Sequence, residues 1–157
     1  MKSKICCFAG HREIYDTTVL REKLRTTVKD LIQTHEVYEF WVGNYGIFDR
    51  MCANVIEDLR KNFPHIRLNL VVPYLTKEIN DNKELYYKKY HNIIIADMPE
   101  TTPKALKIIK CNEYMIKSSG YLICYVNYGF GGAAKTLEFA RRQKGLVIIN
   151  LKDSGFY

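Results

Sequence analysis

Short apolar runs alternate along the chain with longer segments in which apolar residues recur every three or four positions. The runs are continuous enough to be strands that are buried on both faces of a sheet. They cover residues 3–9, 37–42, 66–72, 91–96, 121–126 and 146–151. We therefore expect a sheet of about six strands.

The segments between these runs have the apolar spacing of amphipathic helices. Over residues 17–34, the residues Leu20, Leu24, Val28 and Leu31 mark one helical face, and Asp16 is the predicted N-cap. Further helices are predicted from residue 48 to a point before Pro64, over 76–90, from Pro103 to about residue 118, and over 132–143. Each predicted strand except the last is thus followed by a helical segment.

This alternation predicts an α/β fold, a Rossmann-like three-layer αβα arrangement with a mainly parallel sheet. We find no internal repeat, linker or low-complexity tract in the sequence, and residues 1–157 are expected to form a single domain. In such sheets ligands bind outside the carboxyl ends of the strands, near the point where the strand order reverses. The loops that follow strands therefore carry the candidate site.

Three of these loops combine glycine with polar residues, and each leads into a helix. A helix N-terminus offers unpaired N–H groups that suit a phosphate, and glycine lets the phosphate approach the backbone. Tight turns without a ligand are the alternative explanation of these glycines. The candidate ligand-binding residues are Gly10, His11, Arg12, Gly43, Asn44, Asp49, Gly131, Gly132, Ala133, Lys135 and Thr136.

Each charged candidate has a structural alternative. Arg12 suits a bidentate pair with a phosphate or is an ordinary surface arginine. His11 would donate to a ligand oxygen or shuttle a proton, or instead cap its loop. Asp49 would bond a ribose hydroxyl, or serve the dipole of the helix it begins. Lys135, near the start of the last helix, would neutralise phosphate charge.

Glu138 is the candidate catalytic residue if the protein is an enzyme. Its carboxylate would act on an N-glycosidic bond as nucleophile or general base, and the alternative is a solvated helix residue. Tyr86, Tyr87 and Tyr90 lie in a basic segment, where they would stack on a base, or pack on the sheet edge or a second subunit.

Composition narrows the class of protein. The formal net charge is +7, which makes a polyanionic ligand plausible. Five cysteines without a Cys-x-x-Cys pair indicate buried reduced thiols, and no metal site is expected. The N-terminal apolar run is too short for a signal sequence and no run is long enough for a membrane span, so we expect a cytoplasmic protein with no membrane partner.

Three motifs resemble a known family. Cys7-Phe8-Ala9-Gly10-His11-Arg12 resembles the opening motif of the YpsA-like branch of the SLOG superfamily. Asn112-Glu113-Tyr114-Met115 and Gly131-Gly132-Ala133-Ala134-Lys135-Thr136 are similar to two later motifs of that branch. The resemblance covers nearly the whole chain and implies a Rossmann-like fold with a nucleotide-type ligand at the glycine loop.

The same superfamily contains the LONELY GUY (LOG) phosphoribohydrolases and the DNA-processing protein DprA. Counted from Gly131, Glu138 falls at the glutamate of the LOG motif, whereas Phe130, Ala134 and Lys135 depart from it. Neither a Gly-Lys-Ser/Thr P-loop nor the Gly-x-Gly-x-x-Gly dinucleotide motif occurs at the expected place.

Three functions follow from these observations. The first is a sensor or sequestering module for a nucleotide or nucleotide-derived ligand, with no cofactor required. The second is a LOG-like N-glycosidic phosphoribohydrolase acting on nucleoside monophosphates. The third is DprA-like binding of single-stranded nucleic acid. Because proteins of this superfamily often pair, we also expect a homodimer.

Overall fold

The computed structural model describes residues 2–153. The ends of the expected domain, residue 1 and residues 154–157, lie outside the described residues. Six parallel strands form one sheet in the order β4-β3-β2-β1-β5-β6. The strands are β1 (Ile5–Gly10), β2 (Glu39–Val42), β3 (Arg67–Val72), β4 (Asn92–Ile95), β5 (Tyr121–Tyr125) and β6 (Val147–Asn150). The predicted α/β Rossmann-like fold with about six strands is confirmed.

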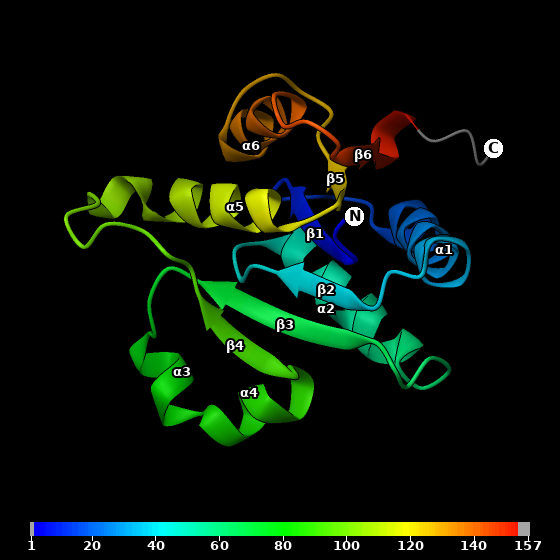
Figure 1. Ribbon diagram of the computed structural model, residues 1–157, viewed down its shortest axis with the longest axis horizontal. Helices are drawn as coiled ribbons and strands as arrows, with labels where there is room; N and C mark the ends of the chain where they lie inside the picture. The colour runs from blue at the N-terminus through cyan, green and yellow to red at the C-terminus, as the bar shows by residue number, and fades with distance from the viewer. Residues whose placement is uncertain (1, 154–157) are drawn as a thin grey trace.

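Helices cover both faces of this sheet (Figure 1). On one face lie α1 (Thr18–His35) and α2 (Ile47–Leu59), and on the other lie α5 (Lys107–Ser118) and α6 (Gly132–Arg141). Two short helices, α3 (Lys77–Asp81) and α4 (Lys83–Lys89), lie beside the edge strand β4. Short 3₁₀ turns, Lys104–Leu106 and Leu151–Asp153, precede α5 and follow β6.

The central strand β1 divides the core in two. Cys6 and Phe8 face the layer of α1 and α2, whereas Cys7 and Ala9 face the layer of α5 and α6. This division follows from the alternation of side chains along a strand and explains why the whole run is apolar. All five cysteines are free and buried, as predicted.

The segment after β3 is helical over most of residues 76–90, as predicted, but it is divided into two helices. The division lies at Asn82, which leaves the helical conformation at φ −127° and ψ 33°. Its side-chain amide donates to the carbonyl of Glu78 at 2.8 Å. The first of the two begins where Thr76 caps it, accepting the N–H of Ile79 at 3.2 Å.

Two other helix starts differ from their predictions by a short distance. The N-cap of α1 is Thr17, while the Asp16 side chain accepts the N–H of Thr18 at 3.1 Å. Pro103 precedes a 3₁₀ turn, so α5 begins four residues later. No helix of residues 2–153 is long and apolar enough to cross a membrane.

Candidate ligand-binding site

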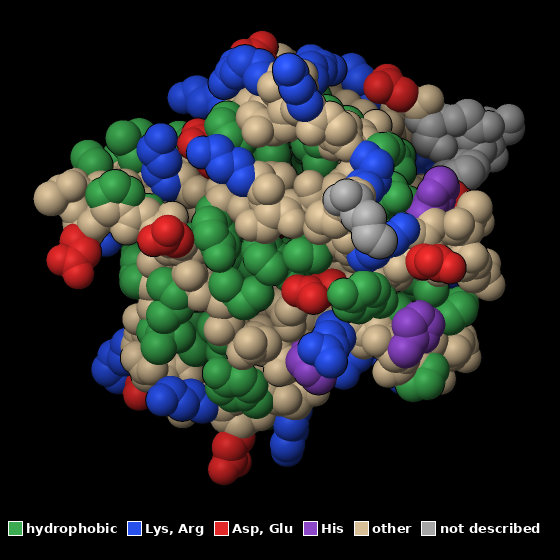
Figure 2. Space-filling view, viewed as in Figure 1, with side chains coloured by type: hydrophobic (Ala, Val, Ile, Leu, Met, Phe, Trp, Pro, Cys, Tyr) green, Lys and Arg blue, Asp and Glu red, His purple; other side chains and the backbone are tan. Residues whose placement is uncertain are grey.

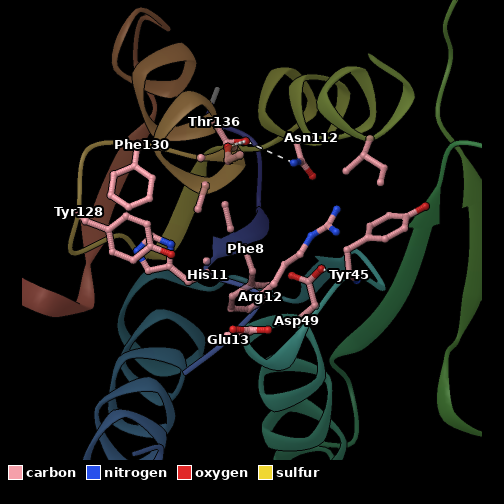
Figure 3. Close-up of a pocket in the computed structure, with 16 residues that line it drawn as sticks. Phe8, His11, Arg12, Glu13, Tyr45, Asp49, Asn112, Tyr128, Phe130 and Thr136 are labelled. Atoms are coloured by element: carbon pink, nitrogen blue, oxygen red, sulfur yellow. Dashed lines mark hydrogen bonds between the residues drawn. The ribbon is translucent and has the colours of Figure 1, made fainter. Parts of the chain in front are cut away.

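A cavity of about 340 Å³ opens where the strand order reverses, at the carboxyl ends of β1 and β5 (Figure 3). The sheet continues from β1 towards β2 on one side and from β5 towards β6 on the other, so the loops after β1 and β5 separate at this point. The lining residues are Phe8, Ala9, Gly10, His11, Arg12, Glu13, Tyr45, Asp49, Ile108, Asn112, Tyr128, Phe130, Gly131, Gly132, Ala133 and Thr136.

The N-terminus of α6 forms one wall of this cavity. Gly131 is the N-cap at φ +90°, a conformation that favours glycine, and no side chain of the described residues caps the terminus. The first backbone bond of the helix runs from the Lys135 N–H to the Gly131 carbonyl at 3.1 Å. The preceding N–H groups, those of Gly132, Ala133 and Ala134, thus belong to the unpaired first turn that suits an anion.

Arg12 faces this helix terminus across the cavity. Its side chain is exposed and extends between Asn112 and Tyr45, above Asp49 (Figure 3). Its backbone is fixed, because the Arg12 carbonyl accepts the N–H of Ile47 at 2.8 Å. At Gly46, with φ +111°, a Cβ would lie 2.5 Å from the Arg12 Cα, so only glycine permits this approach of the two loops.

His11 is 4% exposed and joins the loops after β1 and β5. Its Nε2 accepts the N–H of Asn127 at 3.1 Å, and its ring stacks on Tyr128 with a centroid distance of 3.7 Å. Burial lowers the pKa of His11, and a proton on Nε2 would displace the bond from Asn127. His11 therefore lines the cavity as a neutral ring that caps its loop, the alternative considered for it from the sequence.

Asp49 lies partly buried at the floor of the cavity. Its Oδ2 accepts the N–H of Tyr45 at 2.9 Å, and burial raises the pKa of its carboxyl to about 7. Burial also raises the pKa of the Tyr45 hydroxyl to about 12, so this phenol is a neutral donor. Asp49 is thus an acid of the first turn of α2 that also faces the cavity.

The wall opposite Asp49 consists of residues from α5 and α6, which are joined there by hydrogen bonds. Asn112 donates from Nδ2 to the Thr136 Oγ1 at 3.3 Å, and this hydroxyl donates in turn to the Gly132 carbonyl at 3.0 Å. The Thr136 hydroxyl proton is therefore directed at the helix backbone. The Asn112 amide, by contrast, keeps its carbonyl oxygen available to the cavity.

Four of the predicted site residues do not line this cavity. Gly43 is buried, and a Cβ there would lie 2.9 Å from the Asp49 Oδ2, so this glycine makes room for the carboxylate. Asn44 is exposed. Lys135 lines a separate recess with Arg142. Glu138 lies in recesses outside this cavity.

The position of Glu138 has a simple geometric reason. It follows Gly132 by six residues, which at 3.6 residues per turn places it on the other side of α6, whereas Thr136 follows by four and shares the face of Gly132. The helical period alone therefore indicates that Glu138 and Gly132 lie on different faces of the helix. The comparison with the LOG motif aligned residues by sequence position and did not take the helical faces into account.

Eight lining residues were not among the predicted site residues: Phe8, Ala9, Glu13, Tyr45, Ile108, Asn112, Tyr128 and Phe130. Glu13 directly follows the predicted Arg12, and Tyr45 directly follows the predicted Asn44, so both were within reach of the loop argument. Ile108 comes from the first turn of α5, and no pattern in the sequence indicates that this helix crosses the end of β1. No group of three His, Cys, Asp or Glu side chains within residues 2–153 is placed to hold a metal ion.

Comparison with curated proteins finds relatives that match most of this chain. The UPF0398 protein BH1768 of Halalkalibacterium halodurans is 28% identical over 144 residues, which cover 86% of this chain and 72% of the relative. The uncharacterized SPbeta prophage-derived protein YoqJ of Bacillus subtilis is 22% identical over 139 residues, covering 78% of this chain and 81% of the relative.

Among solved structures, DNA processing protein A of Helicobacter pylori, described as binding single-stranded DNA, matches with a TM-score of 0.61 and 12% identity. The match covers 90% of this chain but only 62% of that protein, and it indicates a shared fold. The family described as YspA SLOG matches residues 3–144, which include the loops after β1, β2 and β5. The chain therefore belongs to the YspA SLOG family.

Proposed function

We propose that the cavity at the carboxyl ends of β1 and β5 binds a nucleotide or nucleotide-derived ligand, and that the protein senses or sequesters it. The observation that carries the proposal is that the uncapped N-terminus of α6 and the guanidinium of Arg12 border the same cavity. Backbone N–H groups at a helix N-terminus and the planar fork of an arginine both suit a phosphate. No cofactor is required for this function.

The rest of the lining suits the remainder of such a ligand. The Asp49 carboxyl, the Tyr45 hydroxyl and the Asn112 amide offer both acceptors and donors to sugar hydroxyls. A cavity of about 340 Å³ lies at the lower end of the range for small-molecule sites, which fits a mononucleotide better than a dinucleotide.

Calorimetric titration with adenosine monophosphate and with adenosine tests the phosphate directly, because the two differ only in that group. We expect the monophosphate to bind and the nucleoside to bind at least tenfold more weakly, about 1.4 kcal/mol. Equal affinity for both compounds would argue against a phosphate at α6. Failure of every member of a nucleoside monophosphate panel would argue against a nucleotide site altogether.

Hydrolysis of an N-glycosidic bond is the alternative function. Since Glu138 lies outside the cavity, a nucleotide held there would meet the carboxyl groups of Glu13 and Asp49 instead. Incubation with the nucleoside monophosphate panel, followed by chromatography for free base, distinguishes a hydrolase from a binding module.

Single-stranded nucleic acid is a second alternative ligand. It is supported by the fold shared with DNA processing protein A and by the Lys and Arg side chains that gather over α6 (Figure 2). Anisotropy of a labelled oligonucleotide at about 50 and 200 mM salt tests it, because phosphate contacts release counterions and make the affinity fall steeply with salt. The cytoplasmic location and the homodimer stay predictions.

A further inference from the structure

Three aromatic rings form a continuous stack along one side of the cavity. The rings of His11 and Tyr128 are stacked face to face and nearly parallel, with an interplanar angle of 6° and a centroid distance of 3.7 Å. Phe130 continues the series at 4.5 Å from Tyr128, tilted by 33°. The stack thus begins in the protein interior at His11 and ends at Phe130 on the cavity wall (Figure 3).

Exposure rises along this stack. His11 is 4% exposed, Tyr128 is 43% exposed and Phe130 is 72% exposed. Phenylalanine is among the residue types most often buried, yet Phe130 belongs to neither core cluster. The glycines on either side of it, Gly129 and Gly131, have open space where a Cβ would be, so the ring is flanked by room rather than by packed side chains.

Two other aromatic residues line the cavity, the buried Phe8 and Tyr45, and the Tyr45 ring is already engaged. Tyr45 lies across the cavity from Phe130, and the Arg12 guanidinium lies 6.0 Å from its ring centroid (Figure 3). Tyr45 also lies beside Asp49 and Asn112, which are polar, whereas the side of Phe130 and Tyr128 presents ring faces. The cavity therefore has a polar side and an aromatic side, separated by the N-terminus of α6.

We propose that Phe130 and Tyr128 form a stacking platform for the base of the ligand, so that Phe130 decides whether a base is recognised. The inference rests on the proposed function, because the N-terminus of α6 must hold the phosphate for the base to reach the ring beside it. Phe130 immediately precedes the N-cap Gly131, so a phosphate at the helix terminus brings the attached nucleoside next to this ring. Every base has a π-face, so the platform tolerates any of them.

The platform predicts a difference between a nucleotide and the same sugar phosphate without a base. The test is calorimetry with the full chain, titrated with the four nucleoside monophosphates and with ribose 5-phosphate. In the wild type we expect each monophosphate to bind more tightly than ribose 5-phosphate. Phe130→Leu keeps an apolar side chain but loses the ring, and we expect it to weaken monophosphate binding about tenfold while leaving ribose 5-phosphate unchanged.

Two further variants control this experiment. Phe130→Tyr keeps a ring and should bind the monophosphates as the wild type does. Tyr87→Leu removes an aromatic ring that is also exposed but lies on α4, outside the cavity, and should change nothing. Circular dichroism of each variant checks that the fold is kept, which the exposure of both positions leads us to expect.

The possible failures are distinct. If ribose 5-phosphate binds but Phe130→Leu leaves monophosphate affinity unchanged, the platform is wrong and the phosphate site stands. Equal weakening of both compounds would also reject the platform, since it would show an effect on the loop. If neither compound binds the wild type, the proposed function is wrong, and the platform that rests on it is wrong with it. A variant that binds normally but changes from dimer to monomer in light scattering would assign Phe130 to a subunit interface instead.

Discussion

The backbone N–H of Tyr45 donates to the Asp49 carboxylate at 2.9 Å and ties the loop after β2 to the first turn of α2. The bond favours the ionised carboxylate, yet burial outweighs it and raises the pKa of Asp49 to about 7. The Arg12 charge, which lies on the cavity side, also lowers that pKa without overcoming burial. This carboxyl therefore changes its charge near neutral pH.

Asp49 should make the stability of the protein depend on pH between about 4 and 7. In this window the folded carboxyl keeps its proton while the unfolded chain, with a pKa of roughly 4, releases it. Unfolding then releases a proton, so the free energy of unfolding should fall as the pH rises through this window and level off above about 7. Asp49→Asn keeps an acceptor for the Tyr45 N–H without the charge and should remove this dependence.

Denaturant unfolding at several pH values measures the effect. We expect the asparagine variant to be about 1–3 kcal/mol more stable than the wild type at pH 8 and about equal to it at pH 4. Asp97→Asn, at an exposed position in the loop after β4, is the matched control and should follow the wild type. Parallel pH curves for Asp49→Asn and the wild type would contradict the prediction.

The strands and long helices could be predicted because their patterns are local. The run of β1 and the spacing of Leu20, Leu24 and Val28 each follow from the period of one element. The break at Asn82 was not predictable in this way, since the apolar residues on either side of it, Ile79 and Tyr86, are also compatible with one continuous helix. The strand order depends on which face each helix covers, and no single segment encodes that.

In the candidate site, too, the features set by local sequence could be predicted, and those set by distant contacts could not. The loops after β1 and β5 border one cavity, because the carboxyl ends of parallel strands share one edge of the sheet. What each side chain does there depends on partners distant in sequence: His11 is held by Asn127, and Gly43 makes room for Asp49. Glu138 does not line the cavity, because six residues along a helix turn it away from the face of Gly132.

Arg12→Ala should weaken ligand binding with little loss of stability. The structural role of this residue belongs to its backbone, whose carbonyl accepts the Ile47 N–H, while its side chain is exposed in the cavity. Loss of a charge-assisted bond to phosphate should cost about 1.5–3 kcal/mol of binding free energy. Calorimetry with adenosine monophosphate measures this, with Arg50→Ala on α2, outside the cavity, as the control. Unchanged affinity would contradict the prediction, and a loss of binding that accompanies a loss of stability would make Arg12 structural.

Glu138→Gln should leave both binding and any release of base unchanged. The reason is position: the carboxylate lies in recesses apart from the cavity, in one of them beside Arg141 and Lys152. Chromatography of free base after incubation with nucleoside monophosphates provides the measurement. If the wild type releases base and this variant does not, the ligand lies beyond the cavity and the LOG-like role of Glu138 stands.

For the predicted homodimer, only part of the tyrosine-rich segment is exposed enough to contact a second subunit. Tyr86 and Tyr90 stack on each other, and Tyr90 is buried in the protein's own core. Exposed apolar side chains remain at Tyr87 and at Ile95, on the unpaired edge of β4. We expect light scattering at micromolar concentration to give twice the 18.4 kDa mass of one chain, and Ile95→Lys to halve it. Val19→Lys, at an exposed site on α1, is the control, and a monomeric wild type would refute the dimer.

Gly10 and Gly132 line the same cavity, but a side chain would have opposite effects at the two positions. A Cβ on Gly10 would lie 2.3 Å from the fully buried ring of Phe48, so Gly10→Ala should lower the free energy of unfolding by about 1–3 kcal/mol. At Gly132 a Cβ meets only open space and φ lies outside the left-handed region, so alanine or valine there should fold.

Gly132→Val should block the approach of a phosphate to the N-terminus of α6. A branched side chain would stand in the open space beside the N–H groups of the first turn of α6, where the phosphate is proposed to lie. We expect adenosine monophosphate binding to be lost in the valine variant and partly kept in Gly132→Ala, with wild-type denaturation curves for both. Gly131 is a poorer site for this test, because at φ +90° any side chain adds about 1–2 kcal/mol of strain. A folded valine variant that binds the nucleotide as tightly as the wild type would place the phosphate elsewhere.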